Sequence, residues 1–263
     1  MLFLQRGGIV LNQQSFITGL TRTSSPGNFT PHFHQEYEIL FVLSGSVKIT
    51  VGGKEYVTGP RSLVFLNNLE EHALQILKEP YERFVLTLSS ARADQILADP
   101  RFLSFFRARP AGFAHCFSVS AQYDAVLRIF ETMHAERKAG PPLEELLCET
   151  LFLQLFILLF RCFPERFPQS ARKSAAQFYA IQRYIDEHFT EPLTVEGLAG
   201  RFFLNKYYFS HHFKEITGYS PKEYLLLNRL SLARDLLLNT SLPVQEIAYR
   251  CGFADVNNFI RMF

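Results

Sequence analysis

"LTVEGLAGRFFLNKYYFSHHF", residues 193–213, is repeated in outline by "PVQEIAYRCGFADVNNFIRMF", residues 243–263. Each copy is typical of a short helix, a turn of three or four residues and a second helix, which is the helix-turn-helix arrangement. Each copy has a small apolar pair in the first helix and two phenylalanines in the second: Leu198, Ala199, Phe209 and Phe213, then Ile247, Ala248, Phe259 and Phe263. The repeat therefore predicts two similar helical units, each with its own apolar core.

Local capping signals set the predicted limits of these helices. Thr194 and Asn205 are suited to cap the N-termini of the two helices in the first unit, and Gly218 is suited to end the second helix. "SPKE" at 220–223 offers Ser at the cap, Pro at the first helical position and Glu at the third, which is a capping box. A long helix is therefore predicted from about Pro221 to Asn239.

The length of this helix suggests a mechanical role. At 1.5 Å per residue it is about 28 Å long. That is close to the roughly 34 Å repeat of DNA that separates recognition helices in successive major-groove turns. The hypothesis is that two DNA-reading units lie about one turn apart on one face of a duplex.

Several motifs at fixed spacing within residues 176–263 resemble one known family. They are Ile247-Ala248, Gly252-Phe253, Phe213-Lys214 with Gly218, "SPKEYL" followed by Arg229, "LARDLLLNTS" and "FADVNNFIRMF". The pattern is similar to the DNA-binding domain of AraC/XylS-type transcriptional regulators. The resemblance implies a double helix-turn-helix domain that binds double-stranded promoter DNA.

The resemblance also implies which side chains read the DNA. The base-reading positions would be Tyr207, Ser210 and His211 in the first recognition helix and Asn257 and Arg261 in the second. The first three share a helix face, and Arg and Asn suit the edges of guanine and adenine. Lys206 and Lys214 flank that face as phosphate contacts, which position the protein without reading sequence. For each side chain, a solvated residue that contacts only phosphate is the alternative.

The front half of the chain, from about residue 9 to 90, has short β-rich runs separated by turn residues. The runs are "EILFVLSGSVKITVGG", "KEYV", "SLVFL", "ALQIL" and "RFVLTLS", and the punctuating residues are Gly45, Gly52-Gly53, Gly59-Pro60 and Asn67-Asn68. Gly52-Gly53 is typical of a two-residue hairpin. These features predict antiparallel strands in a sandwich or barrel, and together with the helices an α+β fold.

Two segments of this region resemble the cupin motifs. The first contains His32, His34 and Glu38, and the second, "GGKEYVTGPRSLVFLNNLEEH", ends at His72. The resemblance implies a cupin-like sensor domain with these four side chains in its effector pocket. Alternate residues of a strand point to one side, so His32, His34, Glu36 and Glu38 are expected on one face of a single strand.

Two interpretations of the four pocket residues stay open. In metal-binding cupins the corresponding residues surround one divalent metal ion, whereas many regulators keep the outline of the motif without a metal. "TGPRS" at 58–62 departs from the enzyme pattern, in which proline, glycine and usually an acidic residue are expected. We expect no cofactor and no metal, and a small-molecule effector for which a sugar is one candidate.

Between about 91 and 163 the apolar period becomes that of helices. "AQYDAVLRIFETMHAERKAG" has one apolar face and ends at Gly140, whereas "PPLEELLCETLFLQLFILLFRCF", 141–163, is apolar on more than one side. A helix that is apolar nearly all round must be covered by more than its own sheet. We expect a homodimer interface here, with packing wholly inside the monomer as the alternative.

The chain of 263 residues is long enough for two cores. "PERFPQSARKSA", 164–175, predicts a linker between a ligand-sensing and dimerisation domain, 1–163, and a DNA-binding domain, 176–263. Four scattered cysteines favour reduced thiols, and the N-terminal residues lack the pattern of a signal peptide. The apolar stretch 151–163 is too short to cross a bilayer. We therefore expect a cytoplasmic protein without a membrane partner.

These expectations describe a transcriptional regulator that answers to a small molecule and is not an enzyme. RNA polymerase would be a further partner if the regulator activates. The alternative is a metal-dependent cupin enzyme, an isomerase or dioxygenase, that uses His32, His34, Glu38 and His72. That alternative leaves the duplicated helical motif without a purpose.

The sequence stops at Phe263, inside the second predicted recognition helix, for which Asp255 is the expected cap. Members of the resembled family usually continue with a further short helix. The chain is therefore expected to be truncated at its C-terminus, and its second reader to be less stable than its first.

Overall fold

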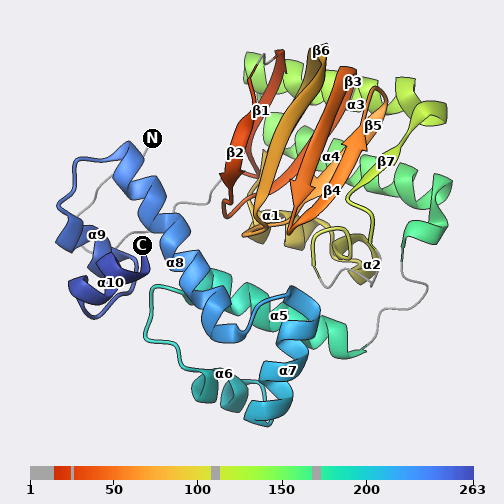
Figure 1. Cartoon of the computed structure of the whole chain (residues 1–263). Coiled ribbons are helices and arrows are strands. Elements are labelled where there is room, and N and C mark those ends of the chain that lie inside the picture. Colours follow the sequence, from red (N-terminus) through yellow and green to blue (C-terminus); the bar gives the residue numbers. More distant parts are fainter. Residues whose placement is uncertain (1–14, 25–26, 108–112, 168–172) are drawn as a thin grey trace.

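The structure is a computed structural model that describes residues 15–24, 27–107, 113–167 and 173–263 (Figure 1). The prediction that no signal peptide is present concerns residues 1–14, which lie outside the described residues. Among the described residues, no helix has the length and hydropathy needed to cross a membrane.

One antiparallel sheet of seven strands forms the N-terminal domain, with the order β1-β6-β3-β5-β7, β2 beside β6 and β4 beside β3. The strands are β1 (Ile17–Ser24), β2 (Phe29–His32), β3 (Tyr37–Val51), β4 (Lys54–Thr58), β5 (Ser62–Leu66), β6 (His72–Leu88) and β7 (Cys116–Ser118). The long strands β3 and β6 pair along almost their whole length, with register shifts between Val42 and Val47. These two strands therefore join the part of the sheet next to β1 and β5 to the part next to β2 and β4.

Of the glycines predicted to form turns, Gly52-Gly53 lies in a turn and Gly45 lies inside a strand. Gly52-Gly53 forms the predicted hairpin, because Val51 pairs with Lys54 and both glycines have positive φ. Gly45, predicted as a turn, lies inside β3 with φ +73°, and a Cβ there would be 2.4 Å from the carbonyl oxygen of Lys78. Glycine is needed because two strands approach closely at an irregularity in the ladder. The runs "ALQIL" and "RFVLTLS", which the sequence predicts to be separate, belong to one strand, β6.

The two faces of the sheet have different partners because neighbouring strand residues point to opposite sides. Tyr37, Ile39 and Phe41 of β3 join the core that includes residues of α3 and α4. The other side, here called the pocket face, carries Glu38 and a second apolar cluster that includes Leu40, Val42, Val64, Leu66 and Tyr81. The pocket face is therefore largely aliphatic with few polar groups.

Four helices complete the N-terminal domain: α1 (Ser90–Ile96), α2 (Pro100–Leu103), α3 (Tyr123–Ala139) and α4 (Glu144–Cys162). Two 3-10 turns, Ser120–Gln122 and Pro164–Arg166, precede α3 and follow α4. The helices α3 and α4 lie behind the sheet in Figure 1. Gly140 ends α3 in the left-handed conformation, as predicted. Within the predicted linker, Phe167 packs into the core of this domain, and α5 begins at Lys173.

The C-terminal helices are α5 (Lys173–His188), α6 (Val195–Arg201), α7 (Lys206–Thr217), α8 (Pro221–Asn239), α9 (Val244–Arg250) and α10 (Val256–Met262). The predicted caps at Thr194, Asn205 and Asp255 each accept backbone hydrogen bonds, and Ser220 with Glu223 forms a complete capping box. The helix α8 has the predicted bounds and is 19 residues long. The predicted two-unit arrangement is therefore confirmed.

Each helix-turn-helix unit has its own core. The first contains the predicted residues Leu198, Ala199, Phe209 and Phe213, and the second contains Ile247, Ala248 and Phe259. Phe263, predicted in the second core, is 59% exposed. Its ring lies at the edge of this core beside Phe259, with the two ring centroids 5.5 Å apart.

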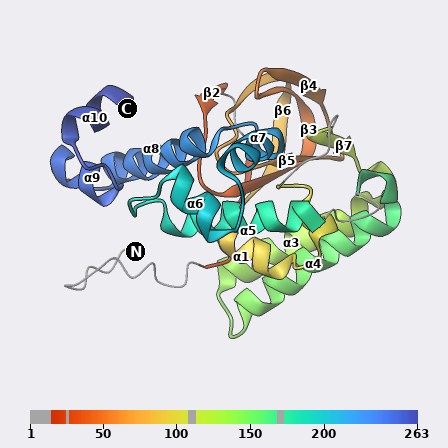
Figure 2. The same ribbon diagram turned by 90° about the horizontal axis from the view of Figure 1, so that it is seen from below.

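The first unit is docked on the N-terminal domain, whereas the second lies at the far end of α8 (Figure 2). Leu69, in the loop between β5 and β6, is 1% exposed and belongs to the same apolar core as Phe213 and Tyr224. Tyr219 donates its hydroxyl to the carbonyl oxygen of Leu69 (3.3 Å), and Asn68 donates to the hydroxyl of Tyr224 (3.1 Å). A side chain of the N-terminal domain thus completes the core of the first helix-turn-helix unit.

Candidate DNA-binding surface and sensor pocket

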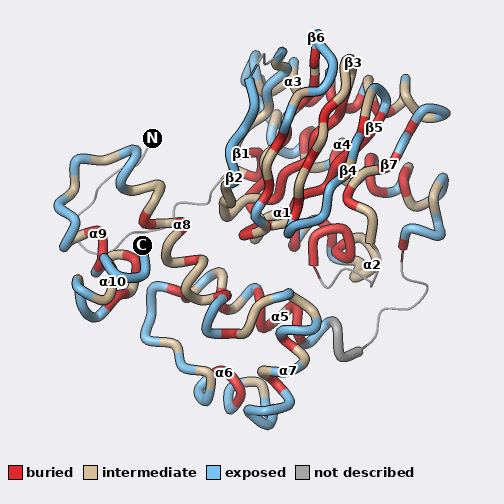
Figure 3. Tube along the Cα trace, viewed as in Figure 1, coloured by how far each residue is buried: buried red, intermediate tan, exposed pale blue. Residues whose placement is uncertain are grey.

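The first candidate reader is α7, which buries one face and exposes the other, as Figure 3 shows. Phe209 and Phe213 are fully buried. On the opposite side Tyr207 is 82% exposed, and the side chain of His211 is 70% exposed. Ser210 is half-buried beside them. The three predicted base-reading residues therefore share an accessible surface.

The two flanking lysines differ in their surroundings. Lys214 is exposed in the last turn of α7. Lys206 forms an ion pair with Glu196 of α6. A phosphate contact from Lys206 would compete with that carboxylate, whereas Lys214 forms no ion pair within the part of the chain that the structure describes. His211 also has a carboxylate neighbour, since its Nδ1 lies 3.5 Å from Glu215.

The second candidate reader is α10. The Asp255 carboxylate accepts from the backbone amides of Asn257 (3.2 Å) and Asn258 (3.0 Å), which fixes the start of the helix. Asn257 and Arg261 are both exposed, and Arg261 donates to the side-chain oxygen of Asn258 (3.0 Å). The turn from α9 to α10 thus presents both predicted readers to solvent. The helices α7 and α10 lie toward opposite ends of α8 (Figure 2).

One exposed aromatic residue near the first reader was missed. Phe203, in the turn between α6 and α7, is 96% exposed and has φ +56°. An apolar ring held outward at a turn of this kind could touch a partner surface. Sequence reasoning on helical periodicity passes over turn residues, so only the unusual "FF" at 202–203 could have indicated it.

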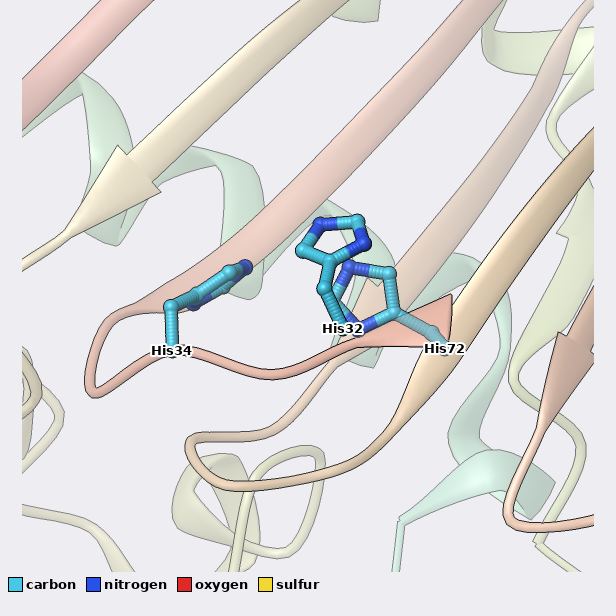
Figure 4. A group of neighbouring side chains, drawn as sticks. All are labelled: His32, His34 and His72. Carbon is cyan, nitrogen blue, oxygen red and sulfur yellow. The ribbon is translucent and has the colours of Figure 1, made fainter. Parts of the chain in front are cut away.

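The four predicted pocket residues do come together, but not from one strand. His32 is the last residue of β2, Glu38 lies on β3 and His72 is the first residue of β6, while His34 lies in the connection 33–36. The prediction of a single strand is wrong because β2 leaves its pairing with β6 at His32 and the chain turns before β3 begins. Figure 4 shows the three imidazoles, and the carboxylate of Glu36, in the same connection as His34, lies 3.6 Å from Nδ1 of His34.

Short distances connect these side chains. The imidazole centroids of His32 and His72 are 4.4 Å apart, and those of His34 and His72 are 5.2 Å apart. The Oε2 atom of Glu38 lies 2.8 Å from Nε2 of His34 and 3.9 Å from Nε2 of His72. The His72 side chain is fully buried, so this end of the pocket face is closed by histidine.

Burial and charge oppose each other in this group. Burial alone would lower the pKa of His34, but the hydrogen bond and negative charge of Glu38 outweigh it and raise that pKa. Burial would raise the pKa of Glu38, and His34 outweighs it and lowers that pKa. Burial lowers the pKa of His72. These directions favour the charged forms of His34 and Glu38 and the uncharged form of His72.

Two further polar residues of the pocket face were missed. Arg83 is opposite Val42 in the ladder, and its guanidinium lies over the rings of Tyr81 (4.9 Å) and Phe29 (5.1 Å). Burial raises the pKa of Tyr81 to about 12. Among the described residues, Tyr81 Oη and the Nε and Nη1 atoms of Arg83 are buried without hydrogen-bond partners. The signal was present in the sequence, because Tyr81, Arg83 and Val85 alternate along one apolar strand.

The comparisons with known proteins agree with this architecture. Residues 17–156 match the family described as the AraC-like ligand binding domain, and residues 198–263 match a helix-turn-helix domain family. The transcriptional activator RhaS of Citrobacter koseri is 27% identical over 248 residues, which cover 89% of this chain and 83% of RhaS. The transcriptional regulator YijO of Escherichia coli is 42% identical over 95 residues, 36% of this chain and 34% of its own.

Solved structures show the same fold. An apo form of ToxT from Vibrio cholerae aligns with a TM-score of 0.62 at 16% identity and covers 96% of this chain and 93% of its own. A second ToxT structure, with unsaturated fatty acid bound, aligns with a TM-score of 0.60 at 15% identity and covers 96% and 91%. The relatives are transcription regulators, so the enzyme alternative finds no support. The chain belongs to the AraC family of transcription regulators, with a ligand-binding domain followed by a helix-turn-helix DNA-binding domain.

Proposed function

We propose that this regulator reads promoter DNA with two helices, α7 and α10. The base-reading side chains are Tyr207, Ser210 and His211 on α7 and Asn257 and Arg261 on α10, with Lys206 and Lys214 on phosphates. One observation carries the proposal: both helices bury phenylalanine on one side and expose these residues on the other. The 19-residue α8 between them supports two contacts about one DNA turn apart.

A binding titration tests this assignment. A duplex selected from a random library by the unaltered protein would be titrated at fixed salt with Arg261→Ala, His211→Ala and Lys214→Ala. Loss of a base contact is expected to cost about 1–3 kcal/mol and to relax preference at one position. Loss of a phosphate contact is expected to weaken all sequences alike and to reduce the salt slope by about one.

The matched control is Arg22→Ala, which removes an exposed arginine that pairs with Glu82 on the sensor domain. This control should leave DNA affinity unchanged. If Arg261→Ala and His211→Ala behave like the control in both affinity and sequence preference, the assignment of readers is wrong.

The small-molecule effector is proposed to bind on the pocket face. This face combines an aliphatic cluster with His32, His34, Glu38 and His72 at one end and Tyr81 and Arg83 within it. Apolar walls with a few converging polar groups are typical of ligand sites. The ToxT structure with unsaturated fatty acid bound supports a small-molecule ligand for this chain, and a sugar is the candidate that the family resemblance offers. The effector can change DNA affinity only if it prefers one arrangement of the domains.

A homodimer through α3 and α4 is also proposed. The outer side of this pair has a groove of about 180 Å³, lined by Ala125, Arg128, Ile129, Thr132, Leu151, Gln154 and Leu158. Leu147 and Ile157 of α4 are also exposed. Such an apolar surface favours a second copy of the chain. Sedimentation of a monomer alone at micromolar concentration would contradict the dimer.

The remaining partners follow from the family. RhaS is a transcriptional activator, which supports RNA polymerase as a partner if this chain also activates. Promoter DNA as a partner supports a cytoplasmic location. Reading DNA through side chains needs no cofactor.

A further inference from the structure

The three histidines of the pocket share one hydrogen-bonding arrangement. Each Nδ1 lies against a backbone carbonyl oxygen: His32 against Thr30 (2.9 Å), His34 against Glu36 (3.1 Å) and His72 against Glu70 (2.8 Å). A carbonyl oxygen only accepts, so each Nδ1 carries the proton that it donates. The Nε2 atom of His34 is hydrogen-bonded to Glu38 (2.8 Å), whereas those of His32 and His72 point away from these carbonyl groups. A backbone carbonyl on the second nitrogen is how proteins orient metal-ligating histidines.

The three imidazoles also converge. One nitrogen from each lies within 4.8 Å of the others, and Figure 4 shows the rings gathered beside the end of β2. His72 is the decisive member: its side chain is fully buried, and among the described residues its Nε2 has no hydrogen-bond partner. Leaving such an atom unsatisfied is costly, so a ligand that accepts its lone pair would be favoured. The Glu38 carboxylate lies 2.8 and 3.9 Å from Nε2 of His34 and His72.

We propose that His32, His34, His72 and Glu38 bind one divalent first-row transition-metal ion such as Zn²⁺. Neutral imidazoles suit Zn²⁺, Co²⁺ and Ni²⁺, whereas Mg²⁺ and Ca²⁺ prefer sites made of oxygen alone. Three nitrogens and one carboxylate make a complete four-ligand set. Coordination through His34 exchanges the proton that this residue shares with Glu38 for the metal ion.

The ligand-bearing segments also hold the DNA-binding domain. Arg234 of α8 donates to the carbonyl oxygen of Phe33 (2.8 Å), and Gln35 donates to the carbonyl oxygen of Asn228 in α8 (3.0 Å). Both contacts flank His34 directly. The carbonyl oxygen of His34 in turn accepts from the backbone amide of Leu69 (2.7 Å), whose side chain lies in the core of the first helix-turn-helix unit.

A metal ion would therefore cross-link the segments that contact α8. It would join the end of β2, the connection 33–36 and the start of β6, and so stabilise the docked arrangement of the first unit. This consequence rests on the proposed regulatory function, whereas the metal site itself does not. Linkage then requires that metal occupancy and DNA affinity affect each other if DNA prefers one arrangement.

A second group of possible ligands lies on the surface and provides the control. His211, His212 and Glu215 are close together on α7, with side chains 70%, 39% and 54% exposed. Here Nδ1 of His212 lies 2.6 Å from Glu215 rather than against a backbone carbonyl. Such an exposed group can chelate a metal weakly, so binding there must be separated from binding in the pocket.

The test is a titration of the full chain with Co²⁺ after treatment with a chelator, followed by visible absorption. We expect one Co²⁺ per chain, displaced by Zn²⁺ but not by Mg²⁺, and no sulfur-to-metal charge-transfer band from the exposed Cys162. His72→Ala and His32→Ala should each weaken binding by at least about 100-fold, beyond the usual loss for an outer-shell partner. His212→Ala should bind as the unaltered chain does. Since His32 is only half-buried, its variant keeps the test valid if His72→Ala fails to fold.

The possible results separate the site from its consequence. Absence of one-to-one binding, or a loss confined to His212→Ala, overturns the metal site. Zn²⁺ should change the Kd for the selected duplex by at least about fivefold in the unaltered chain and not in His32→Ala. An unchanged Kd would overturn the coupling to α8. If the chain binds no DNA under any condition, the regulatory function fails while the Co²⁺ titration still decides the site.

Discussion

At the scale of single residues, Arg107 is the most consequential side chain outside the two candidate sites. It is fully buried, and its Nε and Nη2 atoms donate to Asp94 (2.8 Å) and Asp186 (2.8 Å). Tyr37 donates to Asp94 (2.8 Å), and Tyr224 donates to Asp186 (2.8 Å). Asp186 belongs to α5 and Arg107 to the sensor domain, so this ionic group bridges the two domains.

Asp186→Ala is expected to lower the free energy of unfolding by about 3–5 kcal/mol, because it leaves a buried guanidinium with one carboxylate instead of two. Glu82→Ala is the control, since it breaks the exposed pair with Arg22 and should cost about 0–1 kcal/mol. Urea unfolding followed by circular dichroism suits a chain that has no tryptophan. If both variants lower the free energy of unfolding by similar amounts, the buried ionic group stabilises the fold no more than an exposed ion pair does.

At the scale of elements, the two readers differ in how firmly they are held. The helix α7 has 12 residues and buries Phe209 and Phe213, whereas α10 has seven residues and buries only Phe259 among its described side chains. One more buried phenylalanine is worth about 1.5–3 kcal/mol. The second reader should therefore open more often than the first.

Amide hydrogen exchange measures this difference directly. Amides in the central turns of α7 are expected to exchange at least about tenfold more slowly than those of α10, since each 1.4 kcal/mol is a factor of ten. The comparison is internal to one sample and needs no variant. Equal protection in α7 and α10 would contradict the expectation.

Local signals made the helical elements predictable. The caps at Thr194, Asn205 and Ser220 act within three residues of themselves, so the sequence alone indicates where α6, α7 and α8 begin. Strand limits were less predictable. Gly45 has the residue type of a turn, but it lies inside β3 because the backbone of β6 approaches it closely. The four pocket residues were found by resemblance. Their positions on β2, β3, β6 and the connection 33–36 could not be found in that way, because they depend on where β2 stops pairing with β6.

At the scale of the whole molecule, the sensor and the first DNA-binding unit share a core through Leu69. The contacts that complete this interface join residues far apart in sequence: Arg107 and Asp186, Gln35 and Asn228. No local pattern announces such pairs, which is why the docking could not be predicted from the sequence. The structure therefore adds a direct connection between the N-terminal domain and the first helix-turn-helix unit.

Leu69→Ala is expected to cost about 2–5 kcal/mol and to loosen the docking, because it leaves a cavity in the shared core. Leu77→Ala is the matched control, since Leu77 is 50% exposed on β6 and should change little. Small-angle X-ray scattering should show a larger radius of gyration for Leu69→Ala alone. If the two variants scatter and unfold alike, Leu69 does not hold the domains together.

The place of Leu69 also limits how this protein can exchange parts with its relatives. A recombination event that joins these DNA-binding helices to a foreign sensor would carry away the side chain that completes their core. The new sensor would need an apolar residue at the tip of the same loop to refill the space. The loop between β5 and β6 therefore belongs by sequence to the N-terminal domain and by packing to the first helix-turn-helix unit.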